Sequence, residues 1–509
     1  MMKMSNPSTL LELIQTGPAE STAIILPDLG LRITRQQLRD QVTSMADALA
    51  SIGIQKGDRV ATYCTNGLPA IVSFLAASIA GTAAPLNPGY REEEVNFYLE
   101  DTNAKVLLVL PEGGDAAKKA AAVRGVPVYT LVTDDKGFVR IEGATPNSNQ
   151  GKKATPPTPE DFALILHTSG STGRPKRVPI AHKNITASTK NIVAHYSLSP
   201  QDVSLCVMPL FHVHGLVAST LSTLLSGGTV AVPNKFAPLS FWRTVRDTGA
   251  TWYSAVPTIH NMLLSRAGET RPEGAEQLRF IRSCSASLPP EMMAQMEKVF
   301  GAPVLEAYGM TEASHQMSSN PQPPSARKPG SVGRATGIKI GIMDEAGNLL
   351  PPDTRGEVVI QGPNVVAGYE NNPEANAKSF TNGWFRTGDQ GVLDAEGYLS
   401  LTGRIKELIN RGGEKIGPRE IDEVLLSHPA VAEAVCFGVP HPSWGEEVEA
   451  AVVLKEEFKD STKDADIMAF CKERLAEFKR PKKLHITTQI PRTATGKIQR
   501  GVVAKAFGA

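Results

Sequence analysis

Cysteine, a charge excess of either sign and long apolar runs are all scarce in this chain of 509 residues. Its five cysteines form no C-x-x-C pair and no cluster with histidine, so we expect neither a disulfide framework nor a structural zinc site. The 53 lysines and arginines nearly balance the 52 acidic residues. The resulting net charge of +1 gives no overall attraction to nucleic acid or to an anionic membrane.

Segments that would direct the chain to a membrane or anchor it there are also lacking. The least charged stretches, residues 60–90 and 203–234, are broken by proline and glycine, so neither offers the ~20 unbroken apolar residues of a span. The N-terminal apolar run is too short for a signal peptide, and the C-terminal letters AFGA differ from the peroxisomal SKL address. We therefore expect a cytoplasmic protein, and leave open whether it is a monomer or a dimer.

What is present is a globular composition, with 41% hydrophobic residues, on a chain long enough for several domains. Residues 44–52 have helical periodicity, residues 58–63 have the pattern of a strand, and residues 70–80 have that of a buried helix. This alternation through the first 150 residues predicts an α/β fold, in which a mostly parallel sheet carries helices on both faces.

The C-terminal third predicts two further units. Residues 332–343, 356–362 and 391–401 read as short strands separated by glycine, proline and asparagine, so residues 330–402 are expected to form a β-rich subdomain. Beyond residue 403 the alternation of helix and strand resumes with more charge. We therefore predict a large N-terminal domain of mixed sheets over residues 1–402, followed by a small α+β domain.

The segment HTSGSTGRPK, residues 167–176, follows directly on a predicted strand, residues 162–167. Glycine lets the backbone approach an anion closely, hydroxyls and backbone amides donate to phosphate oxygens, and lysine adds positive charge. The spacing of Gly170, Gly173 and Lys176 differs from the Walker pattern of nucleotide-binding loops. The segment alone leaves two alternatives open, a phosphate-binding loop or a surface loop without a chemical role.

Five later segments follow in a characteristic order: MPLFHVHG at 208–215, EAYGMTE at 306–312, WFRTGD at 384–389, GRIKELI at 403–409 and PRTATGK at 491–497. Together with the glycine-rich loop, they make the chain resemble the adenylate-forming superfamily of acyl-CoA synthetases, luciferase and peptide-synthetase adenylation domains. The resemblance covers nearly the whole chain. It implies an enzyme that joins a carboxylic acid to AMP and then transfers the acyl group to the thiol of coenzyme A.

The resemblance also assigns roles to residues, with ATP, Mg²⁺ and coenzyme A as the small-molecule partners. It implies that Glu312 holds Mg²⁺, and that Lys497, Thr311 and Glu312 are catalytic, with Lys497 neutralising charge that develops at the α-phosphate. For Asp389, a turn carboxylate is the alternative to a ribose-binding group. The implied ATP-binding residues are Thr168, Ser169, Gly170, Ser171, Thr172, Gly173, Lys176, Glu306, Ala307, Tyr308, Thr311, Asp389, Arg404 and Lys497.

Lys406 resembles the position at which family members pivot the small domain between the two steps. This makes residues 403–406 the expected hinge and residues 407–509 a mobile C-terminal domain. Gly412, Gly413 and Lys415 are expected to lie beside coenzyme A. For Lys406 the alternative is an ordinary exposed lysine that only solvates a surface.

The predicted acid pocket is polar, whereas a fatty or aromatic acid needs an apolar tunnel. Its expected residues are His212, His214, Ser285, Ser287 and His315. The segments FHVHG, RSCSASL and MTEASH are most similar to those of plant and fungal oxalate-CoA ligases, and a histidine suits an anionic substrate. The resemblance thus predicts conversion of oxalate, ATP and CoA into oxalyl-CoA, AMP and pyrophosphate.

Four alternatives to that prediction remain. The first is a medium-chain or aromatic acyl-CoA ligase. The second is an oxygenating enzyme of the luciferase type, and the third is a peptide-synthetase module, although such a module usually continues into a carrier domain. The fourth is a non-catalytic nucleotide-binding protein, which would keep the glycine-rich loop but lose the segment around Lys497. Each histidine taken singly is also more often structural than functional.

Overall fold

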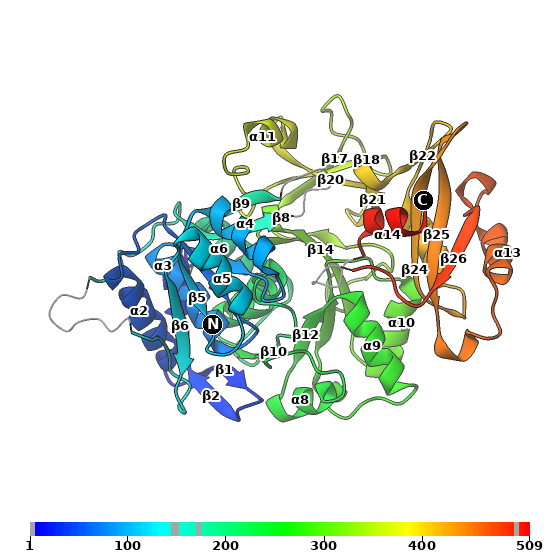
Figure 1. Ribbon diagram of the computed structural model, residues 1–509. Coiled ribbons are helices and arrows are strands. Elements are labelled where there is room, and N and C mark those ends of the chain that lie inside the picture. Colours follow the sequence, from blue (N-terminus) through cyan, green and yellow to red (C-terminus); the bar gives the residue numbers. More distant parts are fainter. Residues whose placement is uncertain (1–5, 144–151, 169–174, 493–497, 509) are drawn as a thin grey trace.

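A computed structural model of the chain describes residues 6–143, 152–168, 175–492 and 498–508. Within that part, the strands form four sheets. Figure 1 shows a parallel sheet with its helices at one side of the molecule and the C-terminal sheet at the other. The predicted α/β class, with a large N-terminal and a small C-terminal part, is confirmed.

The first sheet contains the strand that leads into the glycine-rich loop. The neighbours β3, β4, β5, β6 and β8 pair in parallel, and β7 and β9 add antiparallel edges. Thr168 and Lys176 face each other as the end residues of the antiparallel β8–β9 pair. The predicted loop residues 169–174 lie outside the described part of the chain. The strand order is β7 (Val139–Ile141), β6 (Val128–Thr133), β5 (Ala104–Val109), β3 (Arg59–Tyr63), β4 (Thr82–Leu86), β8 (Phe162–Thr168) and β9 (Lys176–Ala181).

Helices cover both faces of this sheet, as the sequence predicts. In β5, Val106 and Leu108 join the cluster formed with α2 (Arg35–Ser51) and α3 (Leu68–Ala80). Their neighbour Leu107 joins a separate cluster with α4 (Glu92–Thr102) and α5 (Asp115–Arg124). Successive strand residues point to opposite faces, so a continuous apolar strand requires a helix layer on each side.

The second sheet combines strands from the N-terminal segment of the chain with strands from residues 203–335. Its strand order is β16 (Arg334–Ala335), β15 (His315–Ser319), β14 (Val304–Met310), β13 (Phe280–Ser283), β12 (Trp252–Ala255), β10 (Val203–Leu205), β11 (Thr229–Ala231), β1 (Thr22–Leu26) and β2 (Leu31–Thr34). The periodicity predicts that residues 1–150 form one alternating unit. In the structure, however, β1 pairs in parallel with β11, about two hundred residues later in the chain. Periodicity reports a strand's faces and not its partners, so this pairing was not predictable.

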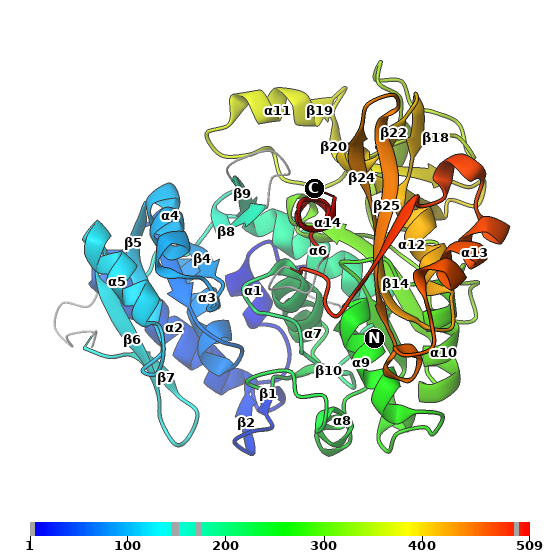
Figure 2. The ribbon, with the colours of Figure 1, turned by 45° about the vertical axis from the view of Figure 1, so that its right-hand side comes forward.

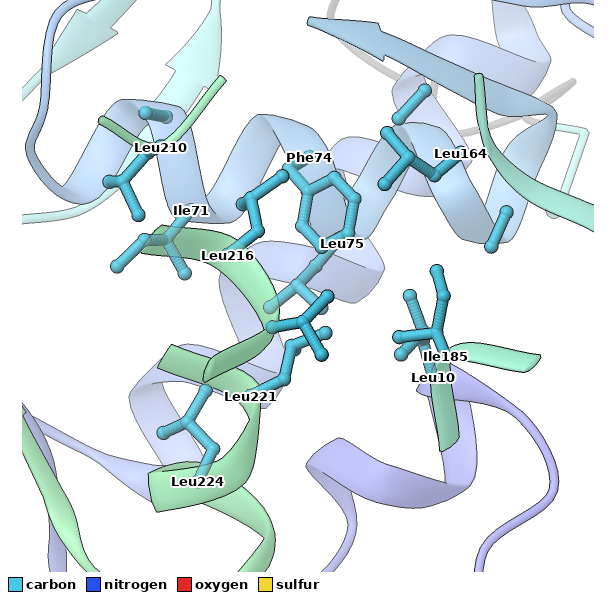
Figure 3. Packing of buried hydrophobic residues seen from close by; sticks show 14 of the residues in the cluster. Leu10, Ile71, Phe74, Leu75, Leu164, Ile185, Leu210, Leu216, Leu221 and Leu224 are labelled. Carbon is cyan, nitrogen blue, oxygen red and sulfur yellow. The ribbon is translucent and has the colours of Figure 1, made fainter. Parts of the chain in front are cut away.

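The largest hydrophobic cluster lies where the helices of the two sheets meet. Figure 3 shows Phe74 and Leu75 of α3 packed toward Leu216 and Leu221, with Leu10 nearby. Leu216 and Leu221 belong to a π-helix, η1 (His214–Leu221), which begins at a predicted site residue. A π-helix is rare and often marks a functional site. The apolar side of η1 therefore fixes the position of the polar residue at its start.

The β-rich subdomain is present, although two of its predicted strands differ. Its strands are β17 (Lys339–Met343), β18 (Arg355–Gln361), β19 (Phe380–Thr381), β20 (Trp384–Leu393) and β21 (Leu399–Arg404). Within residues 332–343, only 334–335 and 339–343 are strand. Residues 391–401 are not one strand but the end of β20, a turn at 394–398 and the start of β21, because the glycine-containing turn reverses the chain.

The C-terminal part forms its own sheet with its own core. Its strands are β22 (Ile409–Arg411), β23 (Glu414–Ile416), β24 (Val431–His441), β25 (Gly445–Leu454) and β26 (Lys483–Thr487). Its helices are α12 (Pro418–Leu426), α13 (Asp464–Arg474) and α14 (Arg500–Phe507). Figure 2 shows this sheet standing beside β14 of the large part. The boundary at 402 and the hinge at 403–406 stay predictions.

Two predictions about absent features concern the described residues. No helix among them has both the length and the apolar character to cross a membrane. All five cysteines are buried and unpaired. The remaining helices are α1 (Leu10–Ile14), α6 (His182–His195), α7 (Ser222–Leu225), α8 (Phe241–Thr248), α9 (Pro257–Ala267), α10 (Pro290–Phe300) and α11 (Pro373–Ser379), with short turns η2 (Ala275–Gln277), η3 (Thr311–Ala313), η4 (Ile405–Glu407), η5 (Glu456–Phe458) and η6 (Glu477–Lys479).

Candidate active site

A tight hairpin joins the predicted nucleotide residues to the predicted acid pocket. Strand β14 ends at Met310, η3 carries Thr311 and Glu312, and β15 begins at His315. Gly309 faces Gln316 across the hairpin, and an added Cβ would lie 2.1 Å from the carbonyl oxygen of His315. Only glycine fits there, so the segment YGMTE can form a close turn. The predicted nucleotide residues and the predicted acid-pocket residue His315 both lie around the tip of this turn.

On the nucleotide side, Glu312 is linked to the glycine-rich loop through Tyr369. The hydroxyl of Tyr369 donates to Oε1 of Glu312 at 2.8 Å, and Nζ of Lys176 lies 4.4 Å from the centre of the Tyr369 ring. Burial raises the pKa of Glu312 and lowers the pKa of Lys176. Sequence reasoning missed Tyr369, which lies outside the six segments, and only its position in space reveals the link.

Three other predicted nucleotide residues form a second group. Tyr308 donates a hydrogen bond to Asp389 Oδ2, and Nε of Arg404 lies 3.1 Å from Asp389 Oδ1. Asp389 and Arg404 are register partners in β20 and β21, so the sheet itself holds this ion pair. Thr387 supports the turn by accepting from the Asp389 N–H through its hydroxyl at 3.1 Å. A carboxylate that only stabilises a turn would accept hydrogen bonds from neighbouring backbone amides. Asp389 is instead 6% exposed, and its carboxylate contacts Tyr308 of β14 and Arg404 of β21.

On the acid side, His214, Ser285 and His315 come together from three elements. The rings of His214 and His315 are stacked with centres 5.1 Å apart, and His214 Nδ1 lies 3.0 Å from the Ser285 hydroxyl. Ser285 has φ of 72°, a left-handed conformation that turns the chain after β13. Both rings are buried. Gly215, next to His214, allows this approach, because a Cβ there would lie 2.3 Å from the carbonyl oxygen of Pro209.

Arg282 of β13 lies behind these residues and is fully buried. Its Nη2 donates to His315 Nε2 at 3.1 Å, and its Nη1 lies 3.4 Å from His214 Nε2 and 2.9 Å from the Ser254 hydroxyl. It also donates to the Tyr196 hydroxyl and to the side-chain oxygen Oε1 of Gln316, at 3.0 Å each. Among the described residues, no carboxylate forms an ion pair with Arg282.

The geometry fixes the protonation of both rings. Arginine is only a donor, so each Nε2 must accept and each ring hydrogen resides on Nδ1. Burial and the nearby Arg282 charge hold the pKa of His214 and of His315 well below 6.5, so both rings are neutral. His214 then donates through Nδ1 to Ser285, whose own hydroxyl hydrogen can point to a ligand. The positive charge of the pocket therefore resides on Arg282 and not on the histidines.

The other two predicted pocket residues lie at its margin. His212 is half-buried, and its Nδ1 accepts the backbone N–H of His214 at 3.2 Å. Ser287 is exposed, two residues beyond Ser285. Arg282 begins the segment RSCSASL, but its role was not predicted from the sequence. A charged residue directly after the apolar pair Phe280 and Ile281 was the signal that could have identified it.

Comparisons with known proteins agree with this geometry. The family model described as AMP-binding enzyme matches residues 13–370, and the model of its C-terminal domain matches residues 420–497. The chain belongs to the AMP-binding enzyme family. The predicted use of ATP and the AMP-forming ligase class are thereby confirmed.

Two curated relatives of this AMP-binding enzyme are called oxalate-CoA ligase. One, from Arabidopsis thaliana, is 48% identical over 93% of both chains. Another, from Saccharomyces cerevisiae, is 44% identical over 96% of this chain and 95% of its own. The solved structure of ATP-bound MatB from Rhodopseudomonas palustris is 31% identical, with a TM-score of 0.90 over 98% of this chain and 99% of its own. Apo MatB superposes over the same shares with a TM-score of 0.80.

For several predicted site residues, the structure shows no contact that tests the predicted role. Ser169, Gly170, Ser171, Thr172, Gly173 and Lys497 lie outside the described residues. Ala307 is buried in β14 beside Tyr308. Lys406 is exposed in η4 and close enough to Lys176 for their charges to interact. All of these assignments stay predictions.

The predicted coenzyme A segment has a simpler structural reason for its glycines. Gly412 and Gly413 have φ of 60° and 96° and form the two-residue turn between β22 and β23. Such a turn requires positive φ at both central residues. Lys415 is exposed in β23. The contact of these residues with coenzyme A stays a prediction, because the turn alone accounts for both glycines.

Proposed function

We propose that this AMP-binding enzyme is an oxalate-CoA ligase that forms oxalyl-CoA, AMP and pyrophosphate from oxalate, ATP and CoA. The observation that carries the proposal is Arg282, a fully buried guanidinium without an acidic partner among the described residues. A buried charge is costly unless a counter-charge arrives. A small acid with a second carboxylate supplies it, and two relatives named oxalate-CoA ligase align over nearly the whole chain.

The second carboxylate would bind to neutral donors that Arg282 polarises. Arg282 donates to His315, and through Ser254 and His214 the hydrogen-bond chain reaches Ser285. Each neutral donor in such a chain becomes stronger because its neighbour is polarised in the same direction. An aliphatic or aromatic acid offers nothing to these donors, so it would leave buried polar groups unpaired.

The reactive carboxylate would face the nucleotide side of the same hairpin. One of its oxygens attacks the α-phosphorus of ATP, the bond to pyrophosphate breaks, and the acyl-adenylate forms. The sulfur of CoA then attacks the carbonyl carbon and AMP leaves. Thr311 and Lys497 are the residues expected to offset the charge that develops on the α-phosphate.

Mg²⁺ fits the residues around Glu312. The carboxylate is a hard oxygen ligand, and Tyr369 fixes its orientation through Oε1. The described residues contain no cluster of three or more histidine, cysteine or acidic side chains that could hold a metal. This agrees with Mg²⁺, which typically takes one or two carboxylates and completes its shell with phosphate oxygens and water. Bound Mg²⁺ would neutralise charge on the phosphates.

The decisive experiment is a panel of acids with ATP, Mg²⁺ and CoA, followed by release of pyrophosphate. Oxalate should exceed acetate, hexanoate and coumarate in kcat/KM by roughly 10³-fold or more, because a site built on buried donors strongly rejects ligands that lack the matching group. Comparable kcat/KM values for hexanoate or coumarate would contradict oxalate as substrate and favour a medium-chain or aromatic acyl-CoA ligase.

His315→Ala tests the pocket within the same assay. Loss of one hydrogen bond to a charged group costs about 1.5–3 kcal/mol, so the KM for oxalate should rise roughly 10- to 100-fold. The KM for ATP should change little, because His315 faces the acid side of the hairpin. Ser51→Ala is the control, since Ser51 is exposed at the end of α2 and belongs to no predicted site, and should leave both constants unchanged. An equal rise in both KM values for His315→Ala would indicate a general defect of the hairpin.

A further inference from the structure

One ion pair connects the large part of the molecule to the C-terminal part at a fully buried point. Nη2 of Arg419, in the first turn of α12, lies 3.7 Å from Oε1 of Glu306 in β14. The side chain of Glu306 is 1% exposed and that of Arg419 is 9% exposed. Glu306 is one of the predicted ATP-binding residues and precedes another, Tyr308, by two positions, but its carboxylate is buried beneath α12. Helix α12 therefore covers the large part beside the predicted nucleotide site.

Glu306 has little to hold its charge apart from Arg419. Its Oε1 accepts the backbone N–H of Leu288 at 3.1 Å, while its Oε2 has no hydrogen-bond partner. The charged groups that face it are Arg419 and Glu423, both on α12, and Glu423 adds repulsion. Burial raises the pKa of Glu306 to about 7, with the charge of Arg419 opposing that rise.

Arg419 is likewise only half satisfied within its own part. Its Nε donates to Glu423 Oε1 at 2.7 Å, one turn further along α12, but its buried Nη2 has no hydrogen-bond partner. The unpaired guanidinium nitrogen of one part therefore faces the incompletely paired carboxylate of the other. Elsewhere α12 packs beside β21, next to the expected hinge.

The contact between α12 and the large part depends on how the large part and the C-terminal part are oriented relative to each other. The molecule superposes on ATP-bound MatB with a TM-score of 0.90 and on apo MatB with 0.80, over the same share of each chain. We propose that Arg419 is a positioning residue for adenylate formation, supplying the counter-charge that allows α12 to seat over Glu306 in this arrangement. The inference rests on the two half-reactions of the proposed function, but on no particular acid.

The physical basis is the asymmetry of buried ion pairs. Removal of one partner leaves an uncompensated charge and is strongly unfavourable, whereas replacement of both by neutral groups is often tolerated. Without Arg419, the seated arrangement would bury ionised Glu306 with Glu423 as its nearest charged neighbour. When the C-terminal part moves away, water can solvate the carboxylate. Arg419 therefore matters for the seated arrangement and not for the transfer step that follows.

The test compares the two half-reactions in full-length Arg419→Gln. Adenylation is followed by exchange of labelled pyrophosphate into ATP with whichever acid of the panel is best, and transfer is followed from supplied acyl-adenylate and CoA. We expect adenylation to fall roughly 100-fold and transfer to change less than about threefold. Addition of Glu306→Gln should restore adenylation to within about tenfold of the parent, because the buried charge is then gone.

The pH dependence separates this role from a merely structural one. Protonation neutralises Glu306, so the defect of Arg419→Gln should shrink as the pH falls from 8 to 6. Glu423→Gln is the matched control on α12 and should reduce adenylation less than threefold, because it removes a neighbour of Arg419 and leaves the ion pair with Glu306. Equal loss of both half-reactions, absence of rescue by Glu306→Gln, or a defect independent of pH would each overturn the inference. A finding that oxalate is not the substrate would not overturn the inference, because the assay uses the best acid found in the panel.

Discussion

At the scale of single residues, the pocket separates charge from hydrogen-bond donation. Arg282 carries the charge within an apolar strand, while His214 and His315 stay neutral and present hydrogens on Nδ1. A neutral imidazole in a fixed tautomer is a directional donor that costs less to bury than an imidazolium. The pocket can thus be dry and still receive an anion.

This separation predicts how acid recognition responds to pH. Burial and the nearby Arg282 charge hold the pKa values of His214 and His315 well below their usual range in the folded protein, so both rings are neutral near neutral pH. The KM for oxalate should therefore stay constant within about twofold between pH 6.5 and 8.5, measured as initial rates of pyrophosphate release. Affinity that falls as the pH rises through 6.5 would instead indicate protonated histidines as the anion-binding groups.

At the scale of elements, the β14–β15 hairpin combines two sites that the sequence lists as separate motifs. Gly309 permits the close turn, Glu312 and Thr311 occupy its tip, and His315 begins the returning strand. The segment after β18 then adds Tyr369, which contacts both Glu312 and Lys176. Such a short hairpin keeps the expected metal ligand Glu312 and the predicted acid-pocket residue His315 at a constant separation.

Tyr369 provides a prediction at this scale. Tyr369→Phe removes the hydrogen bond to Glu312 but keeps the ring beneath Lys176, whereas Tyr369→Leu removes both. A hydrogen bond to a charged group contributes about 1.5–3 kcal/mol, so Tyr369→Phe should raise the Mg²⁺ concentration for half-maximal adenylation roughly tenfold or more. Tyr369→Leu should raise the KM for ATP as well. If Tyr369→Phe leaves the Mg²⁺ dependence unchanged, the hydroxyl does not orient the metal ligand.

At the scale of the whole molecule, the two steps of the proposed reaction need different surfaces near one site. The nucleotide and acid residues are on the large part, while Lys497 and the expected coenzyme A segment belong to the C-terminal part. The expected hinge lies at the end of β21, where Arg404 still belongs to the large part's sheet and Lys406 is exposed. A short exposed segment after a strand can absorb a rotation, since few contacts oppose it.

Lys406→Pro tests that hinge. Proline fixes φ near −65° and restricts the rotation, so adenylation should persist while transfer to CoA falls about tenfold or more. The same two assays measure both steps. Lys497→Ala is the reciprocal variant, and should lower adenylation by roughly 10² to 10³ while transfer from supplied adenylate survives. Normal transfer by Lys406→Pro would place the pivot elsewhere in the chain.

The sequence by itself determined the fold class and the family, and it predicts most of the residues expected around the nucleotide, because glycine-rich loops and ordered motifs act through local backbone geometry. Only the tertiary structure decided that β1 completes a sheet with β11, that Arg282 lies behind His214 and His315, and that Arg419 meets Glu306. Periodicity and motif spacing encode which face of an element is apolar and how a turn closes. They do not encode which distant element it meets, and the pairing of buried charges depends on that meeting.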